Sequence, residues 1–223
     1  MRIAVESRRE NNIAETLKRL GHRVTSWKPE LVVAFGGDGT FLHSEQTYPN
    51  VPKLFIYNSA TCKSCCISDA DKILEKIPGL KFKEEIKLEA EIKGKRISAL
   101  NEINVHYNPP RALRFDVRID GKIVAENVIG DGVVVATPFG ASAYFHSITG
   151  KKFTKGIGIA FNNPTKKMRS IVAKENSAIE VVVKRENGIV AWDDSLKTIP
   201  IKEGDVIKIR KSAPVKVCMF KKV

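Results

Sequence analysis

One acidic residue, Asp38, stands in a short segment otherwise made of three glycines and a threonine, directly after the apolar run 31–35. Because glycine has no Cβ and adopts positive φ readily, backbone N–H groups in such a turn can close on an anion such as phosphate. A carboxylate repels a phosphate, so we interpret Asp38 as a base or a magnesium-coordinating group beside one. The alternative is a tight surface turn that favours Asp. The segment reads Gly36-Gly37-Asp38-Gly39-Thr40.

A second candidate is the pair Asn101-Glu102, which precedes Ile103-Asn104-Val105. The Asn side chain offers a donor and an acceptor that can read a base, an amide or a ribose. A Glu carboxylate accepts hydrogen bonds from ribose hydroxyls, as acidic residues do in dinucleotide sites. The pair is compatible with a nucleotide contact, and an exposed strand end is the alternative.

A third segment, residues 130–144, predicts a buried strand that ends at Thr137-Pro138, followed by a small-residue turn and a helix. Small residues allow a flat ligand to approach backbone N–H groups at a helix N-terminus, where phosphate also binds. Tyr144 can stack on such a ligand or close its pocket. The alternative is a purely structural strand-turn-helix. The polar and small residues of interest are Gly130, Asp131, Gly132, Gly140, Ala141, Ser142, Ala143 and Tyr144.

The four cysteines offer a weaker signal for metal binding. Cys62, Cys65 and Cys66 form a cluster, and Cys218 stands near the end of the chain. A zinc site usually combines two paired ligand sets, and no second set follows the cluster. We therefore predict reduced cysteines and no metal site made by the protein, with a zinc site as the alternative.

The elements that must position these residues change in character along the chain. Over about the first 80 residues, strand-like runs alternate with stretches of helical spacing, which predicts a Rossmann-like parallel α/β sheet. We assign residues 1–83 to this nucleotide-binding domain. The predicted strands are residues 2–6, 24–27, 31–35 and 53–57, and the predicted helices are residues 11–20, 40–47 and 68–77.

Strand alternation takes over after residue 83, so we assign residues 84–223 to a mostly β, β-sandwich-like domain. The family resemblance given below implies that this domain binds a dinucleotide. Asp120-Gly121 predicts a hairpin turn between two strands, and Asn187-Gly188 predicts a second one. One helix is expected near residues 143–147.

The charge balance indicates an anionic partner, because the chain of 223 residues carries a formal net charge of +13. Nucleic acid is one candidate, but only 7% of the residues are aromatic, and nucleic-acid binders usually add aromatic stacking platforms. No segment is long and apolar enough to span a membrane, and the N-terminus does not resemble a signal peptide. We expect a cytoplasmic protein that binds neither nucleic acid nor a membrane.

Together, the three motifs resemble those of the NAD kinase family, in order and spacing. The resemblance covers nearly the whole chain and continues weakly through residues 160–163 and 191–193. The glycine segment alone is shared with diacylglycerol kinases and phosphofructokinases, so Asn101-Glu102 and residues 130–144 make the assignment specific. The resemblance implies that ATP or inorganic polyphosphate, with Mg²⁺ or another divalent metal, phosphorylates the 2′-hydroxyl of the adenosine ribose of NAD to give NADP. It also implies a homo-oligomer, a dimer or a tetramer.

The resemblance also assigns roles to individual residues. Asp38 would be the general base, and the residues around it would hold the donor phosphates. Asn101 and Glu102 would hold the riboses or the nicotinamide end of NAD. The basic residues of segment 151–169 would attract polyanions, with a plain solvated face as the alternative. The other implied binding residues are Gly36, Gly37, Gly39, Thr40, Asp131, Ser142, Ala143, Tyr144, Ser147 and Ala160.

The sequence departs from the family pattern at several positions. Segment 58–66 stands where the family usually has a glycine-rich stretch, Ile129 replaces a frequent Arg, and Asp194 replaces a usual Gly. Two alternatives remain open: a non-catalytic phosphate- or nucleotide-binding member of the family, and a kinase of another substrate such as a lipid.

Overall fold

The computed structural model of the protein describes residues 1–8, 11–58, 70–109 and 111–220. The chain divides into two compact units. Unit 1 comprises Met1–Glu85 and Pro214–Val223, and unit 2 comprises Ile86–Ala213. We expected a second domain running to residue 223, but the last ten residues group with unit 1 because the end of β16 (Val206–Phe220) pairs with a strand of that unit.

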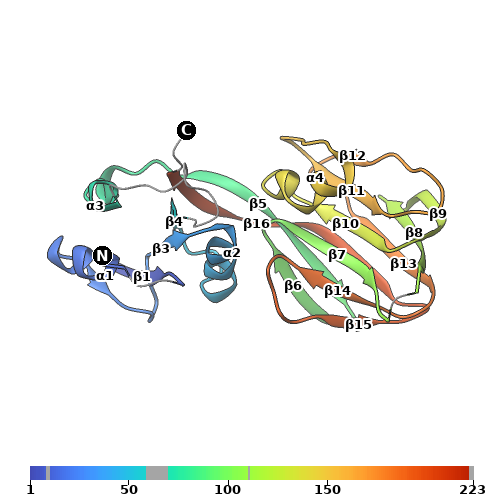
Figure 1. Cartoon of the computed structure of the whole chain (residues 1–223), viewed down its shortest axis with the longest axis horizontal. Helices are drawn as coiled ribbons and strands as arrows, with labels where there is room; N and C mark the ends of the chain where they lie inside the picture. The colour runs from blue at the N-terminus through green and yellow to red at the C-terminus, as the bar shows by residue number, and fades with distance from the viewer. Residues whose placement is uncertain (9–10, 59–69, 110, 221–223) are drawn as a thin grey trace. The chain divides into compact units, whose positions relative to one another are not determined.

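Unit 1 is an α/β unit with a parallel sheet, which confirms the predicted fold class (Figure 1). The strand order is β2-β1-β3-β4, with the end of β16 beyond β4. All of these pairings are parallel. The strands are β1 (Arg2–Glu6), β2 (Arg23–Val24), β3 (Leu31–Gly36) and β4 (Lys53–Tyr57), and the helices are α1 (Ile13–Arg19), α2 (Asp38–Thr47), α3 (Ala70–Leu74) and the 3₁₀ turn Ile77–Gly79.

Helices cover both faces of this sheet, which explains why β3 is an unbroken apolar run rather than an alternating one. Residues of α1 and α3 pack in one cluster with Ile3, Val33 and Leu54. On α2, Phe41 instead stacks on Phe55 of β4 with ring centroids 4.5 Å apart. The glycine segment therefore directly follows a strand whose sheet is packed against helices on both faces.

Unit 2 contains two sheets that pack face to face, as expected for a β-sandwich (Figure 1). The first contains β5 (Lys83–Ile92), β6 (Lys95–Ala99), β8 (Leu113–Ile119), β9 (Lys122–Gly130), β13 (Ile179–Arg185) and the start of β16. The second has the order β12-β11-β10-β7-β14-β15. Its strands are β7 (Glu102–Tyr107), β10 (Gly132–Ala136), β11 (Ile157–Asn162), β12 (Ile171–Ala173), β14 (Gly188–Trp192) and β15 (Ile199–Ile201).

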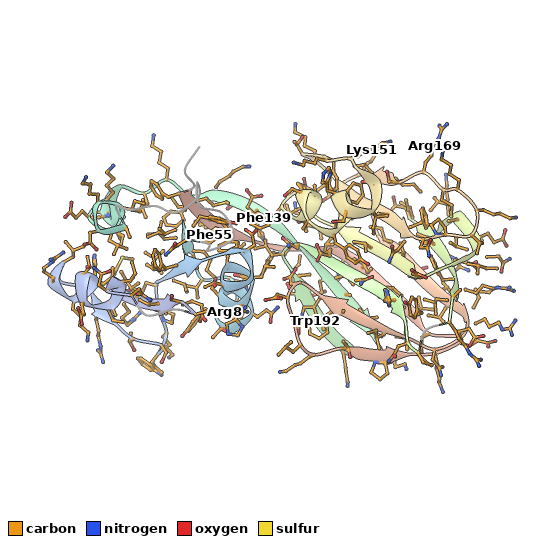
Figure 2. The ribbon with its side chains drawn as sticks, viewed as in Figure 1. Arg8, Phe55, Phe139, Lys151, Arg169 and Trp192 are labelled. Carbon is orange, nitrogen blue, oxygen red and sulfur yellow. The ribbon has the colours of Figure 1, made fainter. Side chains whose placement is uncertain are left out.

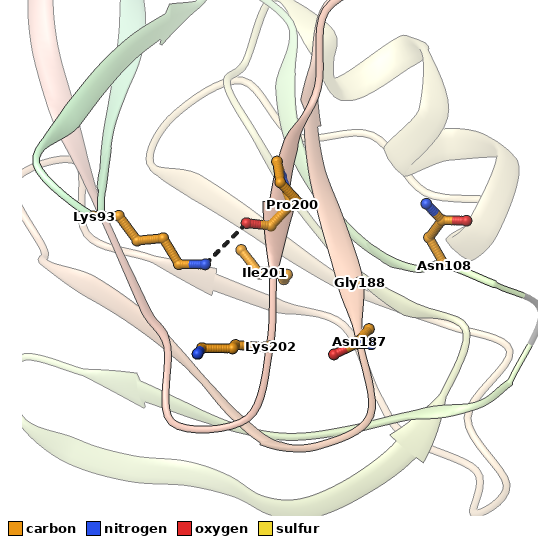
Figure 3. Close-up of a pocket in the computed structure, with 7 residues that line it drawn as sticks. All are labelled: Lys93, Asn108, Asn187, Gly188, Pro200, Ile201 and Lys202. Carbon is orange, nitrogen blue, oxygen red and sulfur yellow. Dashed lines mark hydrogen bonds between the residues drawn. The ribbon is translucent and has the colours of Figure 1, made fainter.

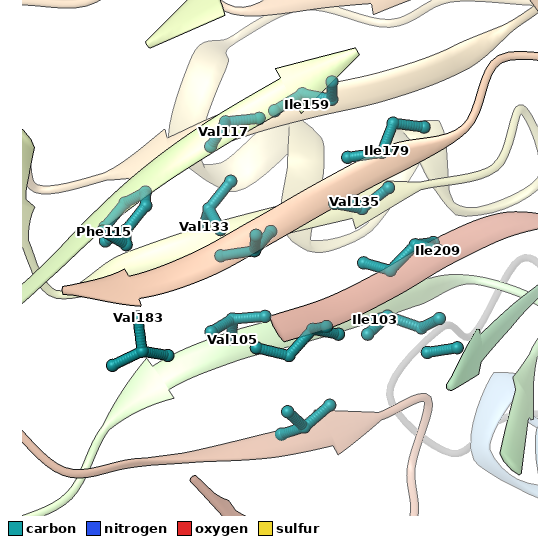
Figure 4. Packing of buried hydrophobic residues seen from close by; sticks show 14 of the residues in the cluster. Ile103, Val105, Phe115, Val117, Val133, Val135, Ile159, Ile179, Val183 and Ile209 are labelled. Atoms are coloured by element: carbon teal, nitrogen blue, oxygen red, sulfur yellow. The ribbon is translucent and has the colours of Figure 1, made fainter. Parts of the chain in front are cut away.

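The core of unit 2 lies between these sheets. Every second residue of β7 and β10 contributes to it, which leaves the intervening residues on the opposite face of the sheet. Part of that opposite face is covered by α4 (Tyr144–Thr149), which follows the 3₁₀ turn Gly140–Ser142 and packs over β10 and β11. Figure 4 shows the core residues Ile103, Val105, Val133 and Val135 together with Phe115, Val117, Ile179 and Ile209.

One of the two predicted hairpins is confirmed and the other is wrong. Asp120 and Gly121 have φ of 52° and 78° and join β8 to β9, which pair with each other. Asn187-Gly188 does not close a hairpin, because β13 and β14 lie in different sheets. A Cβ on Gly188 would stand 2.5 Å from the carbonyl oxygen of His106, so glycine is required there for close strand packing.

Several predicted element boundaries shift. The helix after the glycine segment begins at Asp38 rather than residue 40, and β2 is shorter than predicted. The first two residues of the predicted helix 68–77 lie outside the described residues, and the described helix α3 ends at Leu74. Among the described helices the longest has ten residues, and none is long and apolar enough to cross a membrane.

Candidate functional site

The glycine segment of unit 1 joins the end of β3 to the start of α2. Gly37 is the N-cap of α2, and Asp38 is its first residue. The N–H groups of Thr40 and Phe41 donate to the carbonyl oxygen of Gly37. The N–H groups of the residues just before Thr40 have no acceptor within the helix. They point out of its N-terminus, which is the end of a helix that attracts anions. Asp38 is exposed, so its carboxylate is accessible to a ligand at this end of the helix.

Glycine at position 36 allows Thr40 to fold back over the end of β3. A Cβ on Gly36 would stand 2.5 Å from Thr40 Oγ1. The Thr40 side chain is itself buried. The N–H of Asn58 donates to the carbonyl oxygen of Gly36 at 2.8 Å. The rest of segment 58–66, including its three cysteines and the zinc alternative, lies outside the described residues.

A buried ion pair fixes the other end of α2. Lys53 Nζ lies 2.7 Å from Glu45 Oε2, and both side chains are almost fully buried. The same ammonium donates to the carbonyl oxygens of Tyr48 and Val51. Together with the stacking of Phe41 on Phe55, which is labelled in Figure 2, these bonds hold the helix that carries Asp38.

In unit 2, three sequence segments converge at the start of β7. Asn101 and Glu102 are 8% and 9% exposed. Asp193, which directly follows β14, accepts hydrogen bonds from the N–H groups of Leu100 (2.9 Å) and Asn101 (2.7 Å). Its own N–H donates to the carbonyl oxygen of Glu102. Asp193 thus clamps the backbone of the Asn-Glu pair from a neighbouring strand.

The turn after β10 closes on the same backbone. Thr137 donates through its N–H to the carbonyl oxygen of Asn101 and through its hydroxyl to that of Leu100. The N–H of Gly140 donates to Thr137 Oγ1 at 3.1 Å. A Cβ on Gly140 would lie 2.2 Å from the carbonyl oxygen of Asn101, so only glycine fits this approach.

Two polar oxygens on the outward face of β7 have no hydrogen-bond partner among the described residues. These atoms, Glu102 Oε2 and Asn104 Oδ1, are both buried. Their residues are two apart on one strand and therefore face the same side of the sheet. Burial, with a smaller contribution from Asp193, raises the pKa of Glu102 to about 8. At neutral pH the Glu102 carboxyl thus carries a proton and can donate as well as accept hydrogen bonds.

Tyr144 lies near these groups from the start of α4. Its hydroxyl accepts a hydrogen bond from Asn162 Nδ2 at 2.9 Å. Burial, followed by the charge of Asp131 and a smaller effect of Glu102, raises the pKa of Tyr144. The hydroxyl of Tyr144 therefore stays neutral over a wide pH range. It lies close enough to Asp131 and Glu102 for their negative charge to oppose its ionisation.

The remaining predicted residues lie around this face in different environments. Asp131 Oδ2 accepts a hydrogen bond from Asn163 Nδ2 at 3.3 Å. Ser142 is exposed, and the hydroxyl of Ser147 bonds the carbonyl oxygen of Ala143 within its own helix. Ala160 is fully buried beneath α4, in a cluster with Val134, Ala136 and Phe145. A direct contact from its side chain to a ligand is therefore not available.

Two residues of this face, Asn104 and Asn162, were missed in the sequence. Asn104 was quoted as part of a motif but given no role, although strand alternation from Glu102 would have placed it on the same face. Asn162 lies in segment 160–163, where the family resemblance is only weak, and the sequence assigned it no role. The described residues contain no group of three or more His, Cys, Asp or Glu side chains that could hold a metal ion.

The chain is similar to known proteins in sequence and in fold. Residues 100–218 match the model of the ATP-NAD kinase C-terminal domain. The chain is 31% identical over 209 residues to an NAD kinase of Clostridium beijerinckii, covering 86% of this chain and 73% of the relative. It is 26% identical over 215 residues to an NAD kinase of Thermoplasma acidophilum, covering 91% and 78%.

Two solved structures share the fold. An NAD kinase from Archaeoglobus fulgidus in complex with ATP has a TM-score of 0.82 at 23% identity, covering 98% of this chain and 93% of that one. Yeast NADH kinase complexed with NADH has a TM-score of 0.83 at 16% identity, covering 100% and 84%. The matched domain and the sequence relatives show that the chain belongs to the NAD kinase family.

Proposed function

We propose that the protein transfers the terminal phosphate of ATP or inorganic polyphosphate to the 2′-hydroxyl of the adenosine ribose of NAD, giving NADP. The observation that carries this proposal is the buried, unpartnered oxygen pair Glu102 Oε2 and Asn104 Oδ1 within the described part of the chain. Leaving a buried polar group unpaired costs about 1–3 kcal/mol. A ligand with complementary polar groups would recover that free energy, and family membership supports a dinucleotide as this ligand.

Glu102 is suited to bind a ribose hydroxyl or a carboxamide. With a pKa of about 8, its protonated carboxyl can donate one hydrogen bond and accept another. Asn101 and Asn104 would add amide donors and acceptors beside it. The residues that we propose to line the rest of the dinucleotide site are Asp131, Ser142, Ala143, Tyr144 and Ser147, whereas Ala160 supports α4 from beneath and does not contact the ligand through its side chain.

The glycine segment of unit 1 supports the transfer step. Backbone N–H groups at the start of α2, together with Thr40, would hold the donor phosphates. A ribose hydroxyl is a poor nucleophile at neutral pH, so a carboxylate within hydrogen-bond reach would accelerate attack by accepting its proton. Asp38 is the exposed acid at this helix end, and we assign it this role.

A divalent metal bound to the donor phosphates would offset their negative charge during transfer. The described residues contain no metal-binding cluster of their own, and Asp38 is a single carboxylate. We therefore treat the metal as part of the phosphoryl donor, and the roles of the protein residues above do not depend on a resident ion.

The test is conversion of NAD to NADP by the purified protein with Mg²⁺ and either ATP or polyphosphate. Parallel reactions with NADH distinguish the oxidised from the reduced acceptor, and Asp38→Asn serves as the control for a contaminating kinase. We expect NADP with at least one donor. If neither donor gives NADP above the control while NAD still binds, the non-catalytic alternative replaces the kinase proposal.

A further inference from the structure

A cavity of about 680 Å³ lies in unit 2, between the end of α4 and the loop that leads from β11 to β12. None of the residues proposed above to contact NAD or the phosphoryl donor lines it, and its cations come from the basic segment 151–169, which the family resemblance implies attracts polyanions. Its apolar floor includes Ile148, Phe161 and Met168, and its basic residues are Lys151, Lys167 and Arg169. Figure 2 labels Lys151 and Arg169, which lie along the same edge of unit 2.

The positive charge of this cavity is not paired with an acidic side chain. No carboxylate lines it, and within the described ranges no ion pair involves Lys151, Lys167 or Arg169. The smaller cavity in Figure 3 is a useful contrast, because its Lys93 lies 2.7 Å from the carboxylate of Asp205 and also donates to the carbonyl oxygen of Pro200. Lys151, Lys167 and Arg169 are all exposed, so water weakens their mutual repulsion, and an anion bound among them would turn it into attraction.

Hydrogen bonds hold the loop that carries two of these cations. The N–H of Thr165 donates to the carbonyl oxygen of Ile129 at 2.8 Å. The amide of Asn163, which lines the cavity, donates to Asp131 at 3.3 Å. Lys167 and Arg169 therefore extend from a loop that two hydrogen bonds anchor to the rest of unit 2. These bonds fix the position of the loop side of the cavity.

We infer that this cavity binds an anion that carries several phosphate groups. Its volume lies within the range of sites for organic ligands and is far larger than a single phosphate requires. Three cations match the charge of a short phosphate chain, and both Lys and Arg form charge-assisted hydrogen bonds to phosphate oxygens. A free oligophosphate and a nucleoside triphosphate share this chemistry, and the experiment separates them.

The experiment is calorimetric titration of the full-length protein with tripolyphosphate and, separately, with ATP. Because the glycine segment is also proposed to hold phosphate, the readout is the number of anions bound per chain as well as their affinities. The pocket variant is Lys167→Gln/Arg169→Gln. Its control, Lys95→Gln/Lys122→Gln, removes the same charge from exposed positions on β6 and β9. Melting temperatures verify that both variants fold.

We expect one bound tripolyphosphate to be lost, or its affinity to fall by about tenfold for each cation removed, in the pocket variant only. Unchanged binding by the pocket variant would overturn the inference, and so would an equal loss in the control. Binding of ATP without tripolyphosphate would also overturn it, because the phosphate chain would not be what is recognised. NADP formation is measured separately, so failure here leaves the proposed function intact.

Discussion

The carboxylate of Asp193 accepts a hydrogen bond from the backbone N–H of Asn101 at 2.7 Å, across 92 positions of sequence. The other carboxylate oxygen takes the N–H of Leu100. Two backbone donors that precede β7 are therefore satisfied by one side chain from the end of β14. This bond fixes the position from which Asn101 and Glu102 extend.

We predict that Asp193→Asn weakens this clamp. Asn tolerates the φ of 46° at this position, so the backbone is not newly strained. One carboxylate oxygen becomes an amide that cannot accept a backbone N–H, which should cost about 1–3 kcal/mol of stability. We expect a lower melting temperature and a raised KM for NAD, measured by steady-state kinetics.

Asp194→Asn, the same change at the next, exposed residue, is the control for Asp193→Asn. If both variants raise the KM for NAD equally, the clamp is not what positions the Asn-Glu pair.

Asp38→Asn tests the proposed base. The change keeps the size of the side chain but removes its basic oxygen, so turnover should fall by about 10²–10⁴-fold. NAD affinity and melting temperature should change little, because Asp38 is exposed. The measurements are kcat, NAD binding by titration, and thermal unfolding.

Glu15→Gln supplies the control for Asp38→Asn, since Glu15 is an exposed acid in the first turn of α1. Near-normal turnover of Asp38→Asn would remove Asp38 from the mechanism and direct the search for a base to Asp131, because Glu102 retains its proton at neutral pH.

The raised pKa of Glu102 predicts a pH dependence of stability. In the unfolded chain this carboxyl loses its proton near its ordinary pKa of 4.5, whereas the folded protein retains it up to about pH 8. Between these values the unfolded state binds fewer protons, so the free energy of unfolding falls as pH rises. Glu102→Gln cannot ionise and should lack this fall.

The measurement is the melting temperature of the parent and of Glu102→Gln from pH 5 to pH 9. We expect the melting temperature of Glu102→Gln, relative to that of the parent, to rise with pH up to about pH 8. Above that pH the difference should level off. Glu126→Gln, at an exposed position of β9, should track the parent throughout. A difference between Glu102→Gln and the parent that is independent of pH contradicts the raised pKa.

Gly140→Ala should disrupt the approach of the turn to β7. The new Cβ would overlap the backbone of Asn101, which cannot move without disturbing the bonds from Asp193 and Thr137. Overpacking of this kind costs about 1–3 kcal/mol. Thermal unfolding and NAD titration should both show the loss, whereas Gly79→Ala, with no atom within 4 Å of the new Cβ, should be nearly neutral. Equal effects of the two changes would contradict this reading of the turn.

Local pattern was enough to predict the strands of unit 1, because their apolar runs are buried on both faces and end at recognisable turns. It was not enough at Asn187-Gly188, where the same dipeptide that forms hairpins instead allows β14 to pack closely on β7. Turn chemistry is local, whereas the sheet that a strand joins depends on distant partners.

The same limit applies to the candidate site. Asp38 and Asn101-Glu102 could be singled out because short motifs carry their chemistry, although their roles remain proposals. The clamp by Asp193 could not be found in this way, because its partners lie more than 90 positions earlier and only the fold brings them together. The protonated state of Glu102 likewise depends on burial, which sequence does not report.

The long strand β16 has a consequence for biosynthesis. Its residues 217–220 pair with β4, whose other neighbour is β3, near the opposite end of the chain. A ribosome makes β1 to β4 first, and β4 then presents an open strand edge until residue 220 has been synthesised. Open edges are sites of mispairing with other chains. The part of the protein that is translated first is therefore the part whose sheet is completed last.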